Sequence, residues 1–247
     1  MFREGDWVLI VHGERKFLRR IDPKDSINVR KDVLRFRDVI GKEGGDRVGN
    51  FYLFKPTLED IILYGFKRET QIVYPKDSFY IALKIGAVRG KRVLEFGTGS
   101  GAMCAVLASA GSEVHTFEIR ERFFKLAKKN LERFGLEGEV HFYREDFATA
   151  EVKVEEFDCA FVDVRDPLPY LEKVYACLKK GSPVCFLLPT TNQVASLLAS
   201  ARGLFGDFEV KEILVRDYNP NPDRLRPKDR MVGHTAFTVF GRKISNS

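Results

Sequence analysis

One stretch of this 247-residue chain constrains its fold more than any other: RVLEFGTGSGAMCAVLASAGSEVHTFEI, at 92–119. A short apolar run leads into three alternating glycines, Gly97, Gly99 and Gly101, and a second apolar run follows about a helix later. Strand, glycine turn, helix and strand in that order are typical of a nucleotide-binding unit, because glycines permit a tight turn whose backbone approaches the ligand. The stretch therefore predicts one β–α–β unit of a parallel sheet.

The chain beyond this unit continues the same alternation of strands and helices. The alternation predicts an α/β fold, a doubly wound and mostly parallel sheet with helices on both faces. The last two expected strands have no helix between them, so they must pair antiparallel, because a parallel pair needs a crossover connection. The expected helices are 57–66, 77–88, 101–110, 121–134, 168–178 and 191–204, and the expected strands are 92–96, 113–117, 139–143, 157–162, 183–188, 208–215 and 234–241.

The N-terminal part of the chain follows a different pattern. Short apolar bursts such as WVLIV alternate with Gly, Pro and Asp, which predicts a small antiparallel β domain at 1–55 ahead of the α/β domain at 56–247. Between Val11 and Arg37 there are nine basic and four acidic residues. This excess of positive charge suits either the solvated face of ordinary strands or a groove for a phosphate backbone.

Composition limits the class of protein further. Hydrophobic residues make up 44% and charged residues 31% of the chain, as in a folded globular protein. No apolar run approaches the roughly 20 residues that span a bilayer, and the N-terminus lacks the layout of a signal peptide. We therefore expect a cytoplasmic protein without a membrane partner. The net charge of +6 mildly favours a polyanionic partner.

The four cysteines all lie in apolar runs and show neither a CxxC pair nor a Cys/His ligand spacing. We interpret them as small buried hydrophobic residues and expect no metal. They are Cys104, Cys159, Cys177 and Cys185.

The glycine turn by itself leaves the ligand open. A phosphate-binding loop of the G-x-x-x-x-G-K-[ST] type is excluded, because no lysine follows the glycines. The dinucleotide fingerprint G-x-G-x-x-G/A is matched by Gly97, Gly99 and Ala102, and Glu118 is spaced for a ribose hydroxyl. An NAD cofactor therefore remains possible on the turn alone.

Acidic residues at neighbouring strand ends favour S-adenosylmethionine instead. Glu95 stands directly before the turn, where it would repel a pyrophosphate but attract the cationic amino group of S-adenosylmethionine. Asp146 follows a later strand and could accept a hydrogen bond from an adenine amino group. The antiparallel C-terminal pair is also typical of the methyltransferase variant of this sheet. From the turn and these acids we expect cofactor contacts from Glu95, Gly97, Thr98, Gly99, Ser100, Gly101, Glu118 and Asp146.

Five segments together resemble the tRNA adenine-N1 methyltransferases of the TrmI family, which modify the adenine at position 58 of the tRNA T-loop. EFGTGSG is common to many methyltransferases, whereas TQIVYPKD together with a distant VGHTAF is far more specific. The tail after Phe240 is short, and Thr238 stands where an apolar residue is common in the family. The segments are KPTLEDIILYGFKRETQIVYPKD (55–77), EFGTGSG (95–101), VDVRDP (162–167), LPTTNQV (188–194) and MVGHTAFTVF (231–240).

The resemblance implies an enzyme that methylates N1 of the position-58 adenine, with S-adenosylmethionine as cofactor and a homotetrameric assembly. It implies that Asp163 is catalytic and lies beside the cofactor, that Tyr74 lines the base pocket, and that Gln71 lies near the cofactor. Because adenine N1 has an in-plane lone pair, the work is positioning and electrostatics, and Asp163 would accept a hydrogen bond from the N6 amine. An Asp capping a turn and a Tyr packed before Pro75 are the structural alternatives. We leave His234 out of the catalytic residues, because the chemistry needs no base.

Contacts with tRNA are expected from basic residues. The basic residues of 15–37 are candidates. A second basic group at 224–230 is also a candidate, although the acidic residues around it leave that segment with little net charge. Three other functions remain open: a methyltransferase with another substrate, a non-catalytic tRNA-binding subunit, and an NAD-dependent oxidoreductase. The second basic group comprises Arg224, Arg226, Lys228 and Arg230.

Overall fold

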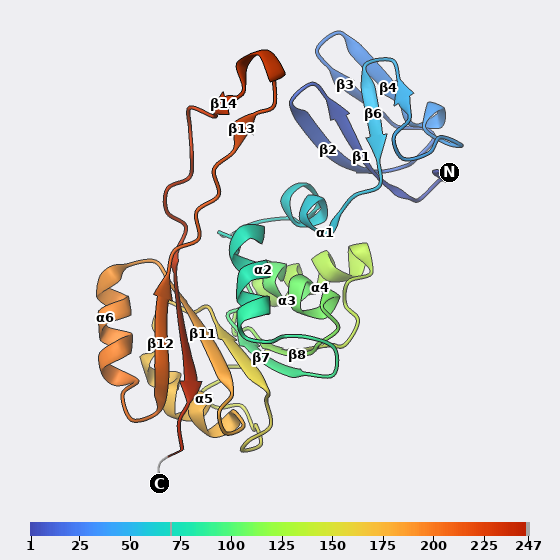
Figure 1. The fold of residues 1–247 in the computed structure, drawn as a ribbon. Coiled ribbons are helices and arrows are strands. Elements are labelled where there is room, and N and C mark those ends of the chain that lie inside the picture. The colour runs from blue at the N-terminus through green and yellow to red at the C-terminus, as the bar shows by residue number, and fades with distance from the viewer. Residues whose placement is uncertain (70, 246–247) are drawn as a thin grey trace. The chain divides into compact units, whose positions relative to one another are not determined.

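The computed structural model describes residues 1–69 and 71–245 and divides into two compact units, Met1–Lys67 and Arg68–Ser247 (Figure 1). The division lies later than the boundary at 55/56 expected from the sequence pattern, because a helical turn after that point belongs to the first unit. Each unit has its own hydrophobic core. No helix in the described part of the chain is long and apolar enough to span a bilayer.

The first unit is an antiparallel β domain, as its pattern predicts. Its strands are β1 (Trp7–His12), β2 (Arg15–Arg20), β3 (Ser26–Val29), β4 (Asp32–Arg35), β5 (Arg47–Val48) and β6 (Phe51–Phe54), with a short helix η1 (Phe36–Asp38) after β4. Four strands form a sheet in the order β2-β1-β6-β5, and β3 pairs with β4 as a separate hairpin. Val8, Ile10 and Leu53 are fully buried in the core between them.

The helix expected at 57–66 is present, and it consists of a short α-helical part followed by a π-helical turn. Helix α1 (Leu58–Asp60) runs directly into the π-helical turn η2 (Ile61–Gly65). A capping box starts it: the Asp60 amide donates to Thr57 Oγ1 at 3.2 Å, and the Thr57 amide donates to Asp60 Oδ2 at 3.0 Å. These bonds satisfy amides that have no partner within the helix, which fixes its start at the predicted residue.

The second unit is built on a seven-stranded sheet. Its strands are β7 (Arg92–Phe96), β8 (Glu113–Phe117), β9 (Val140–Tyr143), β10 (Cys159–Val162), β11 (Pro183–Leu188), β12 (Phe205–Lys211) and β15 (Phe237–Lys243). They lie in the order β12-β15-β11-β10-β7-β8-β9, and β15 alone runs in the direction opposite to the other strands of this sheet. The mostly parallel sheet with an antiparallel C-terminal strand is confirmed.

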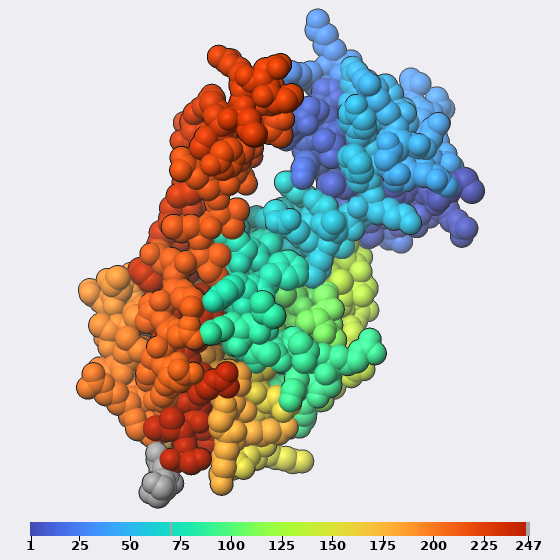
Figure 2. All heavy atoms as spheres, in the orientation of Figure 1, coloured from blue at the N-terminus to red at the C-terminus, as the bar shows by residue number. Residues whose placement is uncertain are grey.

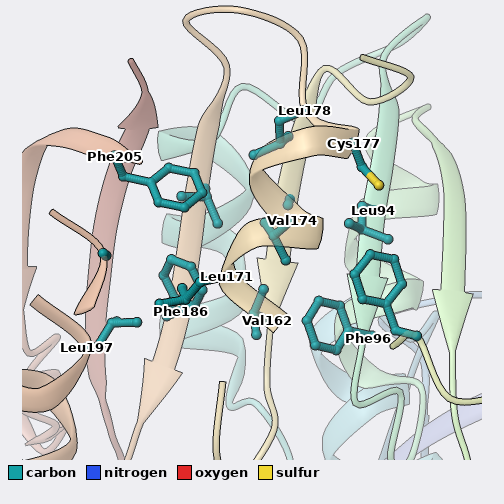
Figure 3. Packing of buried hydrophobic residues seen from close by; sticks show 14 of the residues in the cluster. Leu94, Phe96, Val162, Leu171, Val174, Cys177, Leu178, Phe186, Leu197 and Phe205 are labelled. Atoms are coloured by element: carbon teal, nitrogen blue, oxygen red, sulfur yellow. The ribbon is translucent and has the colours of Figure 1, made fainter. Parts of the chain in front are cut away.

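Helices cover both faces of this sheet (Figure 1). They are α2 (Pro75–Lys84), α3 (Ala102–Ser109), α4 (Glu121–Phe134), α5 (Leu171–Cys177), which follows the short helix η3 (Leu168–Tyr170), and α6 (Thr191–Ser200). Helices α5 and α6 place Leu171, Val174 and Leu197 against buried strand residues such as Val162 and Phe186, as Figure 3 shows.

The two C-terminal strands begin and end at other residues than expected. The apolar run at 213–215 favours a strand that continues to 215, but Leu214 and Val215 keep 59% and 52% of their surface exposed. The strand shifts towards Phe205 instead, because that side chain reaches the core. Residues 212–236 form an extension that carries β13 (Tyr218–Asn219), η4 (Pro222–Arg224) and β14 (Arg226–Pro227) and projects from the rest of the second unit (Figure 2).

The strand order fixes where a ligand can bind. The chain leaves β7 towards β8 and β9 on one side, and later fills the other side with β10 and β11. The winding therefore reverses between β7 and β10, and doubly wound sheets bind ligands beyond the carboxyl ends of the strands at that point. The glycine turn follows β7 and Asp163 follows β10, so the topology brings both to this place.

Candidate active site

The glycine turn between β7 and α3 packs against the end of β10. All three of its glycines have left-handed backbone angles, with φ of +91° at Gly97, +56° at Gly99 and +82° at Gly101. A Cβ at Gly97 would lie 1.9 Å from the carbonyl oxygen of Asp163. One at Gly101 would lie 2.6 Å from the Leu131 side chain on α4. Glycine is required at Gly97 by both conformation and space, so the turn and Asp163 form one rigid junction.

Glu118 is fixed at the side of this turn. It follows β8, keeps only 4% of its surface exposed, and accepts hydrogen bonds from the amides of Gly99 at 3.2 Å and Arg120 at 2.9 Å. A carboxylate that accepts from two backbone amides holds a single orientation and still has lone pairs for a ligand hydroxyl.

Glu95 lies buried beneath the turn. Its side chain is 1% exposed and accepts a hydrogen bond from Cys104 Sγ. Burial raises the pKa of Glu95 from 4.5 to about 7, because a charged carboxylate loses its hydration there. All four cysteines are buried, as expected, but Cys104 contributes a hydrogen bond as well as packing.

Three cavities of the second unit share Asp163 as a lining residue. A small one of about 20 Å³ lies against Glu95 and the turn, and one of about 250 Å³ lies against Glu118 and Asp146. The largest of the three, of about 470 Å³, lies against Tyr74 and Asp163, and is of the size that small-molecule sites have. Asp163 is half-buried, and loss of hydration raises its pKa to about 7.

The structure brings most of the predicted site residues together. Tyr74 caps the start of α2 and lines the largest cavity, and the exposed Gln71 lines both the largest and the smallest. Asp146 is half-buried and its Oδ1 accepts from the Ala148 amide at 2.9 Å. Lining residues of the smallest cavity include Glu95, Gly97, Thr98, Gly99 and Ser100.

Thr98 and Ser100 hold the turn in place through hydrogen bonds, and a third turn residue, Gly101, lies outside the cavities. Thr98 Oγ1 contacts the Phe117 carbonyl at 3.2 Å, and the Ser100 carbonyl accepts from Asn130 Nδ2 at 2.9 Å. Gly101 lines none of these three cavities and packs on α4 instead. Its place in the site is therefore to let the loop close on that helix.

A partly buried polar network lies beside the largest cavity, and sequence reasoning missed it. Lys76 Nζ contacts Asp77 Oδ1 at 2.8 Å, Thr235 Oγ1 at 2.7 Å and the carbonyl oxygen of Ile213 at 2.6 Å. Thr235 Oγ1 donates in turn to Asp77 Oδ2 at 2.9 Å. Lys76 and Asp77 belong to YPKD and Thr235 to VGHTAF, so the two most specific motifs meet here. The occurrence of both motifs in one sequence was the signal that could have pointed to this network.

Replacing Lys76 should destabilise the protein strongly. In Lys76→Met, the Asp77 carboxylate stays buried without its cation, and we expect the free energy of unfolding to fall by about 3 kcal/mol. Urea unfolding measures this change. The matched control, Lys76→Met with Asp77→Asn, removes the unpaired charge and should recover much of the loss. Equal losses in the single and double variants would contradict an ionic role for the pair.

His234 also lines the largest cavity. Its ring nitrogens contact Glu212 Oε1 at 2.5 Å and the Pro189 carbonyl oxygen at 2.9 Å. Both partners accept hydrogen bonds, so they favour the imidazolium and raise the pKa of His234. The ring is thus held by contacts with two other segments, which agrees with leaving it out of the catalytic residues.

Comparisons with known proteins match the whole chain. The family model described as tRNA methyltransferase complex GCD14 subunit covers residues 49–235. The TrmI tRNA (m1A58) methyltransferase of Aquifex aeolicus is 56% identical, with 99% of each chain covered and a TM-score of 0.97. A Thermotoga maritima structure described as a SAM-dependent O-methyltransferase is 38% identical, with 100% of this chain and 96% of that chain covered and a TM-score of 0.93.

A curated relative gives the same family. TrmI of Thermus thermophilus, a tRNA (adenine(58)-N(1))-methyltransferase, is 32% identical over 193 residues, which cover 76% of this chain and 75% of the relative. Together with the site around Asp163, these matches confirm the resemblance seen in the sequence. The chain belongs to the TrmI/GCD14 family of tRNA m1A58 methyltransferases, within the class I S-adenosylmethionine-dependent methyltransferases.

Proposed function

We propose that this protein transfers a methyl group from S-adenosylmethionine to N1 of the adenine at position 58 in the tRNA T-loop. The supporting observation is the 56% identity to the Aquifex aeolicus m1A58 methyltransferase across 99% of both chains. The geometry agrees with this activity, because Asp163 stands between a cavity at the cofactor turn and a larger one that can take a base.

The residues of the turn suit S-adenosylmethionine better than a dinucleotide. Glu95 lies on β7, Glu118 directly follows β8, and Asp146 lies in the turn after β9, so all three are near the carboxyl ends of neighbouring strands. They would take the amino group, the ribose hydroxyls and the adenine amine, respectively. A pyrophosphate at the same turn would lie beside the Glu95 carboxylate, which repels it.

In the proposed mechanism the protein orients the base and stabilises positive charge. When bound, S-adenosylmethionine supplies an electrophilic methyl group, which the in-plane lone pair of adenine N1 can attack without prior loss of a proton. Asp163 accepts a hydrogen bond from the N6 amine and stabilises the positive charge that the base acquires. Tyr74 lies along the same cavity and flanks the extruded adenine ring.

The charge state of Glu95 should show in the stability of the ligand-free protein. Between pH 4.5 and about 7 the folded state keeps a proton that the unfolded state has lost, so the free energy of unfolding falls as pH rises through this range. The shift corresponds to about 3 kcal/mol. Glu95→Gln cannot ionise, so it should match the wild type near pH 4, below the unfolded-state pKa, and exceed its stability at pH 8 by up to this amount. Parallel denaturation curves across this range would contradict the assignment.

We infer that tRNA is bound by cations outside the cavities. The target adenine must be extruded from a folded loop, and phosphate contacts supply most of the affinity for RNA. In the extension, Arg226 pairs with Asp229 at 2.5 Å and Lys228 with Asp217 at 3.2 Å. These pairs reduce the charge available to phosphates, so the basic residues of 15–37 are the stronger candidates.

We further propose a homotetramer. The extension exposes several apolar side chains that a single chain leaves in water, and such a surface is typical of an interface. Equilibrium sedimentation of the full chain measures the assembly directly. The exposed residues are Leu214, Val215, Leu225, Met231 and Val232.

Substrate class can be tested against the O-methyltransferase description of the Thermotoga maritima structure. The protein is incubated with labelled S-adenosylmethionine and either unmodified tRNA transcript or a catechol. We expect label in tRNA only, and less of it as salt increases, because phosphate contacts weaken. Label in the catechol, with none in tRNA, would support O-methylation and overturn the proposal.

A further inference from the structure

A cluster of possible metal ligands lies on the sheet away from the glycine turn. Glu113 and His115 are two residues apart on β8, so their side chains share one face of the sheet. His141 on β9 stands directly opposite His115 in the parallel register. Because β8 begins at Glu113, the cluster lies towards the amino ends of the strands, whereas the glycine turn follows the carboxyl end of β7.

The three side chains converge on one point. Glu113 Oε1 lies 2.9 Å from His115 Nε2 and 3.5 Å from His141 Nε2. The two imidazole rings stack with centroids 4.6 Å apart. One ligand atom from each residue lies within 4.8 Å of the others, and this is the only such group of three or more His, Cys, Asp or Glu side chains among the described residues.

A contact outside the cluster orients the buried imidazole. His115 Nδ1 lies 2.9 Å from the Tyr143 hydroxyl. When Nδ1 carries the proton and donates it to this oxygen, the lone pair of Nε2 points at Glu113 and His141. Metal-binding histidines commonly have their second nitrogen held in this way, because that bond fixes the ring and its tautomer.

We propose that Glu113, His115 and His141 form a Zn²⁺ site. Two imidazoles and one carboxylate are a donor set that zinc binds in a tetrahedral arrangement, with water as the fourth ligand. The expectation of no metal was based on the spacing of the cysteines in the sequence. Such spacing carries no information about a site whose ligands meet only because β8 pairs with β9. Because β9 is an edge strand, the ion would fasten it to the sheet.

Arg92 competes with the ion for these ligands. Its Nη2 lies 3.0 Å from His115 Nε2 and its Nε 3.2 Å from Glu113 Oε2. Its Nη1 also contacts Glu156 Oε1 at 2.7 Å. Zinc must therefore displace the guanidinium from the cluster, while Glu156 can retain it. Removal of Arg92 should strengthen zinc binding by about threefold, the size of a partly exposed ion pair.

Calorimetric titration of the full chain with ZnCl₂ tests the site. We expect one ion per chain, with affinity at least about tenfold weaker in His141→Ala, since loss of a group outside the ligand sphere already has that effect. His141 is exposed, so this variant should fold normally without zinc. His12→Ala is the matched control, because His12 pairs with Asp32 at 2.6 Å in the first unit.

The outcomes separate a built site from general zinc binding to histidines. Tighter binding in Arg92→Gln, unchanged binding in His12→Ala and weaker binding in His141→Ala support the proposal. Replacing zinc with Co²⁺ should also give the intense visible absorption of a tetrahedral site. Equal affinities in the wild type and His141→Ala, an equal loss in His12→Ala, or no zinc binding at all would overturn it.

Discussion

Asp163→Ala should lower kcat for tRNA methylation by about 100- to 1,000-fold, the loss expected when a preorganised group that stabilises transition-state charge is removed. Cofactor affinity should change much less, because Glu95 and Glu118 still line their cavities. Single-turnover kinetics and cofactor titration measure the two effects separately. A variant that kept both its cofactor affinity and the full methylation rate would show that Asp163 is only a turn residue.

The pH dependence of kcat gives this prediction a second readout. Asp163 has a pKa of about 7, and its charged form is the one that stabilises a cationic base. The rate should therefore rise as pH increases through 7, by about tenfold between pH 6 and pH 8. Asp163→Asn preserves size but cannot ionise, so its lower rate should not follow this curve. An unchanged profile in the Asn variant would assign the titration to another group.

Gly97→Ala should abolish detectable cofactor binding and lower the free energy of unfolding by more than about 3 kcal/mol. The added methyl group would lie 1.9 Å from the backbone oxygen of Asp163, so the turn or β10 must move. The left-handed φ of +91° adds backbone strain. Thermal unfolding and cofactor titration measure the two losses.

Gly135→Ala is the matched control for this substitution. Gly135 also has a left-handed φ, of +64°, but no atom lies within 4 Å of the position that its Cβ would take. It should therefore lose about 1 kcal/mol from backbone strain and bind the cofactor normally. Similar losses in both variants would mean that the contact with Asp163 has no effect.

The sequence predicted those elements that bury a regular apolar pattern. Strands β7, β8 and β11 and helix α4 begin and end at the predicted residues. The three strands are short runs that are buried almost continuously, on both faces of the sheet, and α4 buries one stripe with the period of a helix. The segment after β12 was predicted wrongly, because Leu214 and Val215 are apolar yet project into solvent. Hydrophobicity alone does not distinguish such a surface from a core.

Prediction of the site depended on which contacts are local in sequence. In a parallel sheet, a glycine turn and acids at neighbouring strand ends meet at one edge, so Glu95 and Glu118 could be predicted as site residues from the sequence pattern. Asp163 and Tyr74 were named through family resemblance. The bond between Lys76 and Thr235 could not be predicted, because it joins positions 159 residues apart. Likewise, the pairing of His115 with His141 requires the register of two strands.

The most direct test of the central claim is to map the methylated nucleotide. Unmodified tRNA transcript is incubated with the protein and S-adenosylmethionine, and then copied by reverse transcriptase, which stops at 1-methyladenine because the methyl group blocks base pairing. The account predicts a stop at position 58 that is absent when this adenine is replaced by guanine. A stop at 57 as well would extend the substrate to the neighbouring adenine. Methyl transfer without a stop at 58 would contradict the account.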